Sequence, residues 1–319
     1  MLRRILSTGN GLVLVLLLCA CGPGTGRVDP SPSPPASNTA SPSPSRSTPN
    51  PQLIVGFKNN QPNLSQLPAD ASEPVGFEPS MAKAVLSDLL GRQVTFSPIN
   101  VNSWEAQLDK GKIQVAVSTI SYTLERNATH IFAGPYLQTS LGIMVGKDSP
   151  LTRADLDGLK NLNVCYVEKT TAADAVKKLL GPEGRGDKPF NAIPRQNSDD
   201  CLTAIRDHSD QVFLSDAVIL LGRSIATPGR DLYRYIDYDP GSSPQLYGIA
   251  LRPEDSALCL QIDHALDQYL GDERWFRSFS TWFGSAAGDR ALTEHAYKPK
   301  QTITEWCSPK SSQQQRPGS

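Results

Sequence analysis

Ser118-Thr-Ile-Ser-Tyr-Thr-Leu-Glu-Arg126, continued by His130-Ile-Phe-Ala-Gly-Pro-Tyr136, is the most informative segment of this chain. The apolar residues 113–117 precede it and predict a buried strand. Hydroxyl side chains follow the strand, and Thr123, a candidate helix N-cap, stands shortly before Arg126. Hydroxyl groups and a guanidinium supply directional and charged donors, which suits the binding of a small carboxylate. The alternative is an ordinary strand-to-helix turn with a capping threonine and a solvated arginine.

The first residues have the features of an export signal. Arg3 and Arg4 form a basic start, and the apolar residues 12–18 are too few to span a membrane. The sequence Leu18-Cys-Ala-Cys-Gly22 resembles a bacterial lipobox in which Cys21 would carry the lipid. We therefore expect residues 1–20 to be a lipoprotein signal peptide, with a plain secretory signal as the alternative. Either signal exports the mature chain, and the lipid would anchor it on the extracytoplasmic face of the cell membrane.

Residues 21–51 follow as a tract rich in proline and serine, which predicts a disordered tether. The body after it has about 250 residues, enough for one large or two smaller lobes. Residues 1–20 hold two of the 31 basic residues and none of the 32 acidic ones, so the remaining chain has a net charge near −3. This balance predicts neither nucleic acid nor an anionic membrane face as a partner, and only the lipid should contact the bilayer.

The body contains four cysteines, which allow three disulfide pairings. We favour Cys165–Cys201 and Cys259–Cys307, because each pair lies within one segment of the body. An exported protein meets an oxidising environment, and each disulfide would stabilise the fold by about 3–4 kcal/mol. Metal binding is the alternative, but the sequence has no C-x-x-C spacing and its four histidines are scattered.

Alternating strand and helix patterns predict an α/β body. The expected strands cover residues 53–57, 94–99, 113–117, 164–167, 189–194, 211–214 and 247–251. The expected helices cover residues 79–90, 104–110, 155–159, 172–180, 199–207, 217–223, 256–270 and 274–283. Two such alternating runs predict two lobes, each a mostly parallel sheet flanked by helices.

The order of these elements also predicts how the lobes divide the chain. Lobe 1 is expected at residues 52–139 and 243–285, and lobe 2 at residues 140–242. Two hinge crossings, near residues 138–141 and 239–245, should join them. We expect the last two helices to pack on lobe 1. Residues 286–319 should be a polar, partly disordered tail, mostly frayed from residue 301, that only Trp306 and Cys307 pin down.

Four segments of the body resemble one known family. They are Gly76-Phe-Glu78 with Ala82-Lys83, the segment Ser118–Tyr136, Thr170-Thr171, and Leu214-Ser-Asp216. Together they resemble the type 2 periplasmic-binding-protein fold, and within it the polar-amino-acid receptors of ABC importers. The chain is most similar to the glutamate-binding lipoproteins of Gram-positive actinobacteria. Those proteins share a lysine after the first strand, the pair Gln61-Pro62, and a cysteine pair placed like Cys165 and Cys201.

The resemblance implies ligand-binding roles for residues of both lobes. Arg126 would pair with the α-carboxylate of an amino acid, helped by the backbone N–H of Ser121. Thr170 and Thr171 would add donors at a helix N-terminus, where the dipole favours an anion. Asp216, together with Thr119, would bind the α-ammonium group. A helix N-cap is the alternative role for Asp216.

The residues that would contact the ligand side chain are less conventional. Lys58 lies at the carboxyl end of the first strand, where an ammonium group would favour glutamate, then aspartate or glutamine. A solvated loop lysine is the alternative. Trp104 and Tyr122 are candidate walls of the pocket. Lys169 replaces the family's usual glycine before the two threonines, so it could add a second cation or indicate a changed ligand. Gln114 likewise replaces a common acidic residue.

These expectations describe a monomeric, lipid-anchored receptor that captures a polar amino acid and delivers it to an ABC permease. No cofactor and no metal are expected. A ligand-sensing lipoprotein that acts on a membrane kinase or receptor is the alternative with the same binding module. An enzyme is disfavoured because the sequence has no G-x-S-x-G motif and no metal-ligand spacing.

Overall fold

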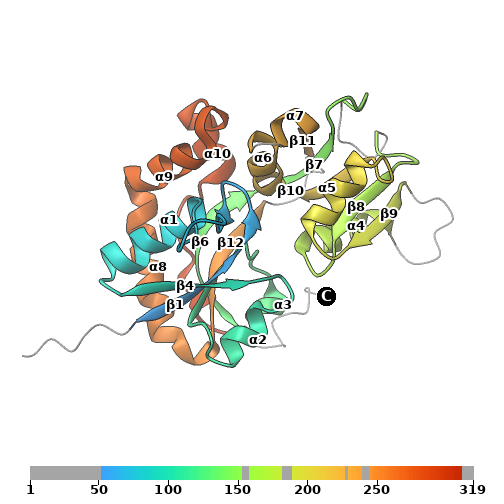
Figure 1. Ribbon diagram of the computed structural model, residues 1–319. Helices are drawn as coiled ribbons and strands as arrows, with labels where there is room; N and C mark the ends of the chain where they lie inside the picture. Colours follow the sequence, from blue (N-terminus) through green and yellow to red (C-terminus); the bar gives the residue numbers. More distant parts are fainter. Residues whose placement is uncertain (1–51, 153–157, 182–188, 227–228, 239–243, 311–319) are drawn as a thin grey trace, which may run out of the picture. The chain divides into compact units, whose positions relative to one another are not determined.

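The computed structural model describes residues 52–152, 158–181, 189–226, 229–238 and 244–310. The expected signal peptide, the lipidated Cys21 and the tether lie outside these residues. So do most of the expected helix 155–159 and most of the second hinge crossing. Two five-stranded sheets, each with its own helices, form the described body (Figure 1). Within the described residues, no helix is both long and apolar enough to span a bilayer.

The first sheet, which we call the sheet of lobe 1, has the strand order β4-β1-β5-β12-β6. Its strands are β1 (Leu53–Lys58), β4 (Val94–Ile99), β5 (Val115–Val117), β6 (Ile131–Thr139) and β12 (Gln245–Leu251). β1 is parallel to β4 and β5, whereas β12 runs antiparallel to β5 and β6. A small hairpin of β2 (Asn60–Gln61) and β3 (Ser65–Gln66) follows β1.

The second sheet, in lobe 2, repeats this pattern with the order β11-β7-β10-β8-β9. Its strands are β7 (Leu141–Gly146), β8 (Asn163–Val167), β9 (Asn191–Arg195), β10 (Val212–Asp216) and β11 (Tyr233–Tyr238). β8 is parallel to β9 and β10, and β7 is the one antiparallel strand. Each sheet is therefore mixed, with four strands in one direction and one in the other, which agrees with the mostly parallel sheets predicted.

Helices cover both faces of each sheet because the strands are apolar on both sides. In lobe 1 these are α1 (Phe77–Ala82), continued by the π-helical η1 (Lys83–Leu89), α2 (Trp104–Asp109), α3 (Leu124–Asn127), α8 (Ser256–Gly271), α9 (Glu273–Phe283) and α10 (Arg290–Tyr297). In lobe 2 they are α4 (Thr171–Leu180), α5 (Ser198–Arg206), α6 (Ala217–Ile225) and α7 (Gly229–Leu232). Short 3₁₀ turns are η2 (Pro253–Asp255), η3 (Gly284–Ala287) and η4 (Thr304–Cys307).

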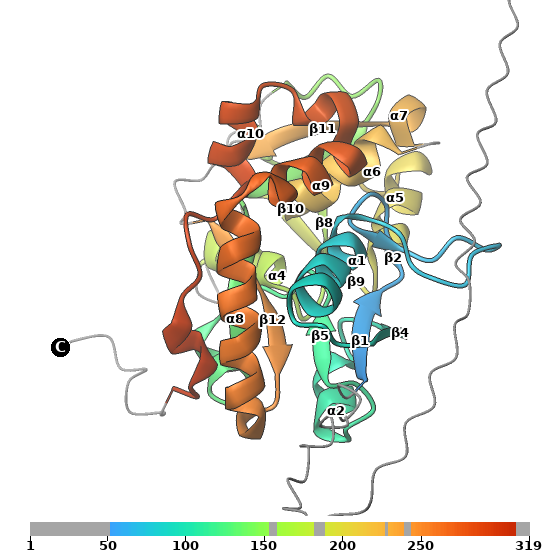
Figure 2. The same cartoon turned by 90° about the vertical axis from the view of Figure 1, so that its left-hand side faces the viewer.

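The strands divide their side chains between two cores. In β5, Val115 and Val117 join the core beneath α1, α8 and α9, while Ala116 faces the opposite core with Trp104. Figure 2 shows α1 and α8 side by side over the first of these faces. The last helices thus pack on lobe 1, as the sequence predicts. In lobe 2 the same alternation places Leu214 in one core and Phe213 in the other.

The C-terminal segment differs from the expected tail. Residues 290–297 form the helix α10, and η4 follows at residues 304–307. Trp306 is buried, and Cys307 forms the disulfide with Cys259. The second disulfide joins Cys165 and Cys201, so both predicted pairings are present. The expectation of a mostly frayed segment from residue 301 is therefore wrong for residues 301–310, because the disulfide and the buried indole hold them against lobe 1.

Candidate functional site

A cavity of about 50 Å³ lies where the carboxyl ends of strands from both sheets meet. β1 and β5 of lobe 1 and β8 and β10 of lobe 2 lead into it, as expected for a site at the carboxyl ends of strands. A single water molecule needs about 10–15 Å³ of cavity volume, so this cavity would hold roughly four water molecules. Its lining residues are Lys58, Val101, Trp104, Ser118, Thr119, Ile120, Ser121, Arg126, Val167, Thr170, Thr171, Ala172, Ser198, Ser215, Asp216 and Ile219.

Arg126 reaches the cavity from the one-turn helix α3. The Thr123 hydroxyl caps this helix by accepting from the backbone N–H of Arg126 at 3.1 Å, as predicted. The guanidinium donates from Nη1 to the carbonyl of Ser121 at 2.7 Å. Among the described residues, no carboxylate forms an ion pair with it. Desolvation lowers the pKa of Arg126, and the half-buried guanidinium lines the cavity.

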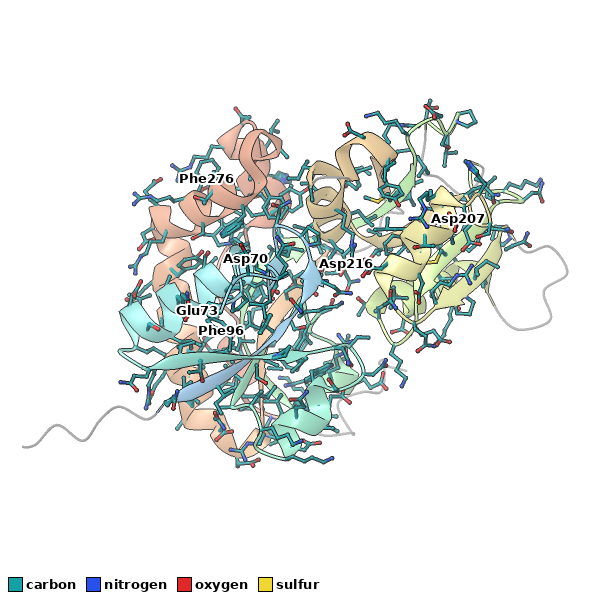
Figure 3. The ribbon with its side chains drawn as sticks, viewed as in Figure 1. Asp70, Glu73, Phe96, Asp207, Asp216 and Phe276 are labelled. Atoms are coloured by element: carbon teal, nitrogen blue, oxygen red, sulfur yellow. A yellow bond between two sulfur atoms is a disulfide. The ribbon has the colours of Figure 1, made fainter. Side chains whose placement is uncertain are left out.

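Asp216 faces the same cavity from the end of β10, at the start of α6 (Figure 3). Its Oδ2 accepts from the hydroxyl of Tyr247 in lobe 1, and its Oδ1 has no hydrogen-bond partner among the described residues. The side chain does not cap α6, so the N-cap hydrogen bond that was the alternative is not formed. Burial raises the pKa of Asp216. A cationic group in the cavity would satisfy Oδ1 and offset this cost.

Lys58 lies at the end of β1 and lines the cavity. Its ammonium group makes no hydrogen bond or ion pair within the described residues. Burial, and secondly the charge of Arg223, lower its pKa to about 8. The alternative of a solvated loop lysine therefore does not describe this side chain. An anionic group beside it would restore the ordinary pKa of a lysine.

Glu78 lies close to Lys58 and was missing from the predicted site. Its Oε1 accepts from the backbone N–H of Thr119 at 2.6 Å and from the Tyr136 hydroxyl, and its Oε2 has no partner among the described residues. Burial raises its pKa to about 7. Gly76 allows this placement, because its φ is 130° and a Cβ there would collide with the Leu64 carbonyl.

The threonines of lobe 2 meet the hydroxyls of lobe 1 across the cavity. Thr170 is the N-cap of α4, and its hydroxyl accepts from the backbone N–H of Ala173 at 3.2 Å. Thr171 opens the helix, and its Oγ1 lies 3.1 Å from the Oγ of Ser121. Thr170, Thr171 and Ala172 line the cavity at the start of this ten-residue helix, where the N–H groups and the helix dipole would favour an anion.

Thr119 has a different local role from the predicted one. Its φ is +48°, and its hydroxyl donates to the Ser118 carbonyl at 2.8 Å and accepts from Gln61 Nε2 at 3.0 Å. The hydroxyl is thus engaged within lobe 1, although the residue still lines the cavity.

The remaining predicted residues divide between the cavity and other places. Trp104 lines the cavity and packs against His130. Tyr122 does not line it and instead stacks on Trp306. Lys169 is exposed and also lies outside the lining, and its φ of +57° is a left-handed backbone conformation that favours glycine. Gln114 accepts from the backbone N–H of Ile54. This bond connects the residue before β5 to β1, and Gln114 does not line the cavity.

Some lining residues were missed although the sequence offers a signal. Ser198 and Ser215 follow or end strands β9 and β10, at the same sheet edge as the predicted residues. Asn197 caps α5 through the backbone N–H groups of Asp199 and Asp200, a pattern that marks the helix start and thus the strand end. No cluster of His, Cys, Asp and Glu suited to a metal occurs in the described part of the chain.

Two lobes of matching topology, with opposed buried charges facing one cavity, define a two-lobed protein that binds a small ligand. The chain belongs to the bacterial extracellular solute-binding proteins, family 3. The sequence pattern of that family matches residues 53–285. This confirms the resemblance at the level of the family. The match ends before α10 and η4.

Individual relatives and solved structures agree with this membership. The glutamine-binding protein GlnH of Bacillus subtilis is 23% identical over 235 residues, which are 73% of this chain and 81% of that protein. The glutamate-binding protein GluB of Corynebacterium glutamicum is 26% identical over 239 residues, 70% and 75% of the two chains. A structure of an ancestral arginine-binding protein bound to glutamine superposes with a TM-score of 0.63 at 24% identity, covering 73% of this chain and 98% of that one. This likeness confirms the fold.

Proposed function

We propose that this protein captures a free polar α-amino acid, with glutamate preferred over aspartate and glutamine, for an ABC importer. One observation carries the proposal. The guanidinium of Arg126, from lobe 1, and the carboxylate of Asp216, from lobe 2, face one cavity without pairing to each other. An α-amino acid carries one carboxylate and one ammonium group on the same carbon. Its carboxylate would pair with Arg126 and its ammonium group with Asp216.

The α-carboxylate would lie against Arg126. A guanidinium can donate two parallel hydrogen bonds to a carboxylate, and within the described residues only Nη1 of Arg126 forms a hydrogen bond, to the Ser121 carbonyl. The N-terminus of α4 at Thr171 would add backbone donors from lobe 2. The ligand would take the place of the Ser121–Thr171 contact, so binding would join the two lobes through the ligand. The α-ammonium would bind Oδ1 of Asp216.

The preference for an acidic side chain rests on Lys58. The charged residues that line the cavity are Lys58, Arg126 and Asp216, which leave one positive charge. A glutamate or aspartate with a net charge of −1 would neutralise it. Glu78 lies behind this cavity, but its pKa of about 7 leaves it partly protonated at neutral pH. The relatives named as glutamate-binding and glutamine-binding proteins support a ligand of this size and class.

The cellular setting of this function follows from the sequence. We propose that Cys21 carries the lipid that anchors an exported monomer to the membrane, and that an ABC permease receives the ligand. The two disulfides support export, because such bonds persist in oxidising compartments. The bilayer would contact the lipid only.

Calorimetry on the chain purified with Cys21→Ser tests the proposal. A panel of the twenty amino acids should reveal one-site binding, with glutamate binding most tightly. Arg126→Ala should weaken binding at least about 100-fold, because it removes the charge partner of a buried carboxylate. Arg126→Lys keeps the positive charge but loses the planar guanidinium that can donate two parallel hydrogen bonds. Its affinity should therefore lie between those of the wild type and Arg126→Ala. Full binding by Arg126→Ala would refute the site, and no binding of any amino acid would refute the function.

A further inference from the structure

The segment Thr302–Lys310, which we call the strap, lies beyond the region that matches the family and is firmly tied to lobe 1. Cys307 joins it covalently to Cys259 of α8. The backbone N–H of Ile303 donates to the Gly134 carbonyl of β6 at 2.7 Å. The hydroxyls of Thr302 and Thr304 donate to Asp263 Oδ2 at 3.1 and 2.9 Å. These bonds fix the strap across the sheet of lobe 1.

The strap also reaches the loop that carries Arg126. The Trp306 ring stacks on Tyr122, with ring centroids 4.0 Å apart and planes 3° from parallel. The Trp306 carbonyl accepts from Asn127 Nδ2 at 3.2 Å, and the backbone N–H of Lys310 donates to the Asn127 carbonyl at 3.2 Å. Asn127 is fully buried, and its side-chain oxygen accepts from the Tyr122 hydroxyl. The strap therefore holds the residues on both sides of Arg126.

This loop needs such support. α3 has only four residues, and one helical turn has little stability of its own in water because helix nucleation is unfavourable. The capping bond from Thr123 closes the turn but does not fix where the turn lies. Its position must come from tertiary contacts, and the contacts of Tyr122 and Asn127 with the strap supply them.

We propose that Trp306 is a positioning residue of the ligand site, anchored by the Cys259–Cys307 disulfide. It does not line the cavity, so it acts on the ligand through Tyr122, Asn127 and the placement of the Arg126 guanidinium. The inference rests on the proposed function in one respect, the role of Arg126 in binding the ligand carboxylate. Loss of the stacked indole would let α3 move and would weaken carboxylate binding more than it weakens the fold.

The first test compares two tryptophan variants of the full chain by calorimetry with L-glutamate and by thermal unfolding. Trp306→Ala should raise the Kd at least about tenfold. Trp282→Ala is the matched control, because the partly buried Trp282 packs against the core on the other face of the same sheet and donates to Ser80. It should lower the Tm but leave the Kd within about twofold. Trp306→Tyr should restore most of the affinity by stacking on Tyr122. An unchanged Kd in folded Trp306→Ala, or equal losses in the two alanine variants, would overturn the inference.

The second test needs no ligand and so separates this inference from the proposed function. Hydrogen exchange of the backbone amides at residues 124–128 should be at least about tenfold faster in Trp306→Ala than in the wild type, and unchanged in Trp282→Ala. The double variant Cys259→Ser/Cys307→Ser should show the same local acceleration, whereas Cys165→Ser/Cys201→Ser should not. If Trp306→Ala does not fold, Trp306→Leu keeps an apolar side chain without the stacked ring. Unchanged exchange at residues 124–128 in these strap variants would refute the positioning role even if glutamate binds as proposed.

Discussion

The Tyr247 hydroxyl donates a hydrogen bond to Asp216 Oδ2, so a residue of the lobe 1 sheet orients a carboxylate at the end of a lobe 2 strand. Oδ1 is buried and has no hydrogen-bond partner among the described residues, and the Asp216 side chain lines the cavity. This bond favours the ionised form of Asp216, whereas burial opposes it. The tyrosine thus helps to keep the negative charge that an ammonium ligand requires.

Tyr247→Phe should weaken ligand binding about tenfold and lower the free energy of unfolding by about 1–3 kcal/mol. The variant leaves a second buried oxygen of Asp216 without a partner and raises the pKa of Asp216 further. Calorimetry and urea unfolding measure the two effects. Tyr233→Phe is the control, because it also removes a donating hydroxyl, which in this case donates to the backbone carbonyl of Leu202 away from the cavity. Equal changes in affinity for the two variants would contradict the role of Tyr247.

Lys58→Met should change the ligand preference rather than abolish binding. The affinity for glutamate should fall at least about tenfold, while the affinity for glutamine should change less than about threefold, because only the acidic side chain loses a charge partner. Titration of both amino acids into the variant and the wild type gives the ratio. Equal losses of affinity for glutamate and glutamine would show that Lys58 does not recognise the ligand side chain.

Glu78→Gln should stabilise the protein more at pH 8 than at pH 5. The folded pKa of Glu78 is raised to about 7, so its favourable contribution is complete below the unfolded pKa of 4.5 and is lost as the pH rises through 7. Glutamine keeps an acceptor for Thr119 without a buried charge, and the gain relative to wild type should grow by on the order of 2 kcal/mol between the two pH values. Urea unfolding at both pH values measures it. The exposed Glu254→Gln should show no comparable trend, and a gain for Glu78→Gln that is independent of pH would contradict the assignment.

Lys169→Gly should raise the free energy of unfolding by about 0.5–1 kcal/mol and leave the Kd within about threefold. A left-handed backbone costs a lysine but not a glycine, and the exposed side chain does not line the cavity. Asn161→Gly, at a φ of 63°, is the control with a smaller expected gain, because asparagine tolerates this conformation. A tenfold loss of glutamate affinity in Lys169→Gly would instead support a second cation at the ligand.

The strands predicted best from the sequence are those with the simplest signals. β1 extends the predicted strand by one residue, because a continuous apolar run marks a strand that is buried on both faces. β4 has the predicted bounds, although it is a partly exposed edge strand in which polar residues interrupt the apolar ones. β6 was not predicted as a strand because Gly134-Pro135 in its centre is a turn signal. β11 was missed because its Tyr-Arg-Tyr-Ile-Asp-Tyr sequence lies at a sheet edge and carries no buried run.

The residues of the site also differ in whether the local sequence predicts them or only the packing of distant segments reveals them. Lys58 and Arg126 could be placed at the cavity because each follows a strand that the sequence marks, and Thr171 and Asp216 because their segments resemble those of a known family. Glu78 could not, because an acidic residue in the first turn of a helix is an ordinary partner of the helix dipole. Tyr247 contacts Asp216, and Trp306 contacts the loop that carries Arg126, only after distant segments pack together. No local sequence pattern predicts these contacts.

The helix α6 contributes side chains to the cores of both lobes. Val218 and Ile219 belong to the core of lobe 1, although α6 follows a strand of lobe 2. Together with the Tyr247 bond, this ties Asp216 to lobe 1, whereas Thr171 stands on α4 in the separate core of lobe 2. Separation of the two lobes would therefore have to break the packing of Val218 and Ile219 on lobe 1 as well as the Tyr247 bond, so both contacts would resist opening of the site.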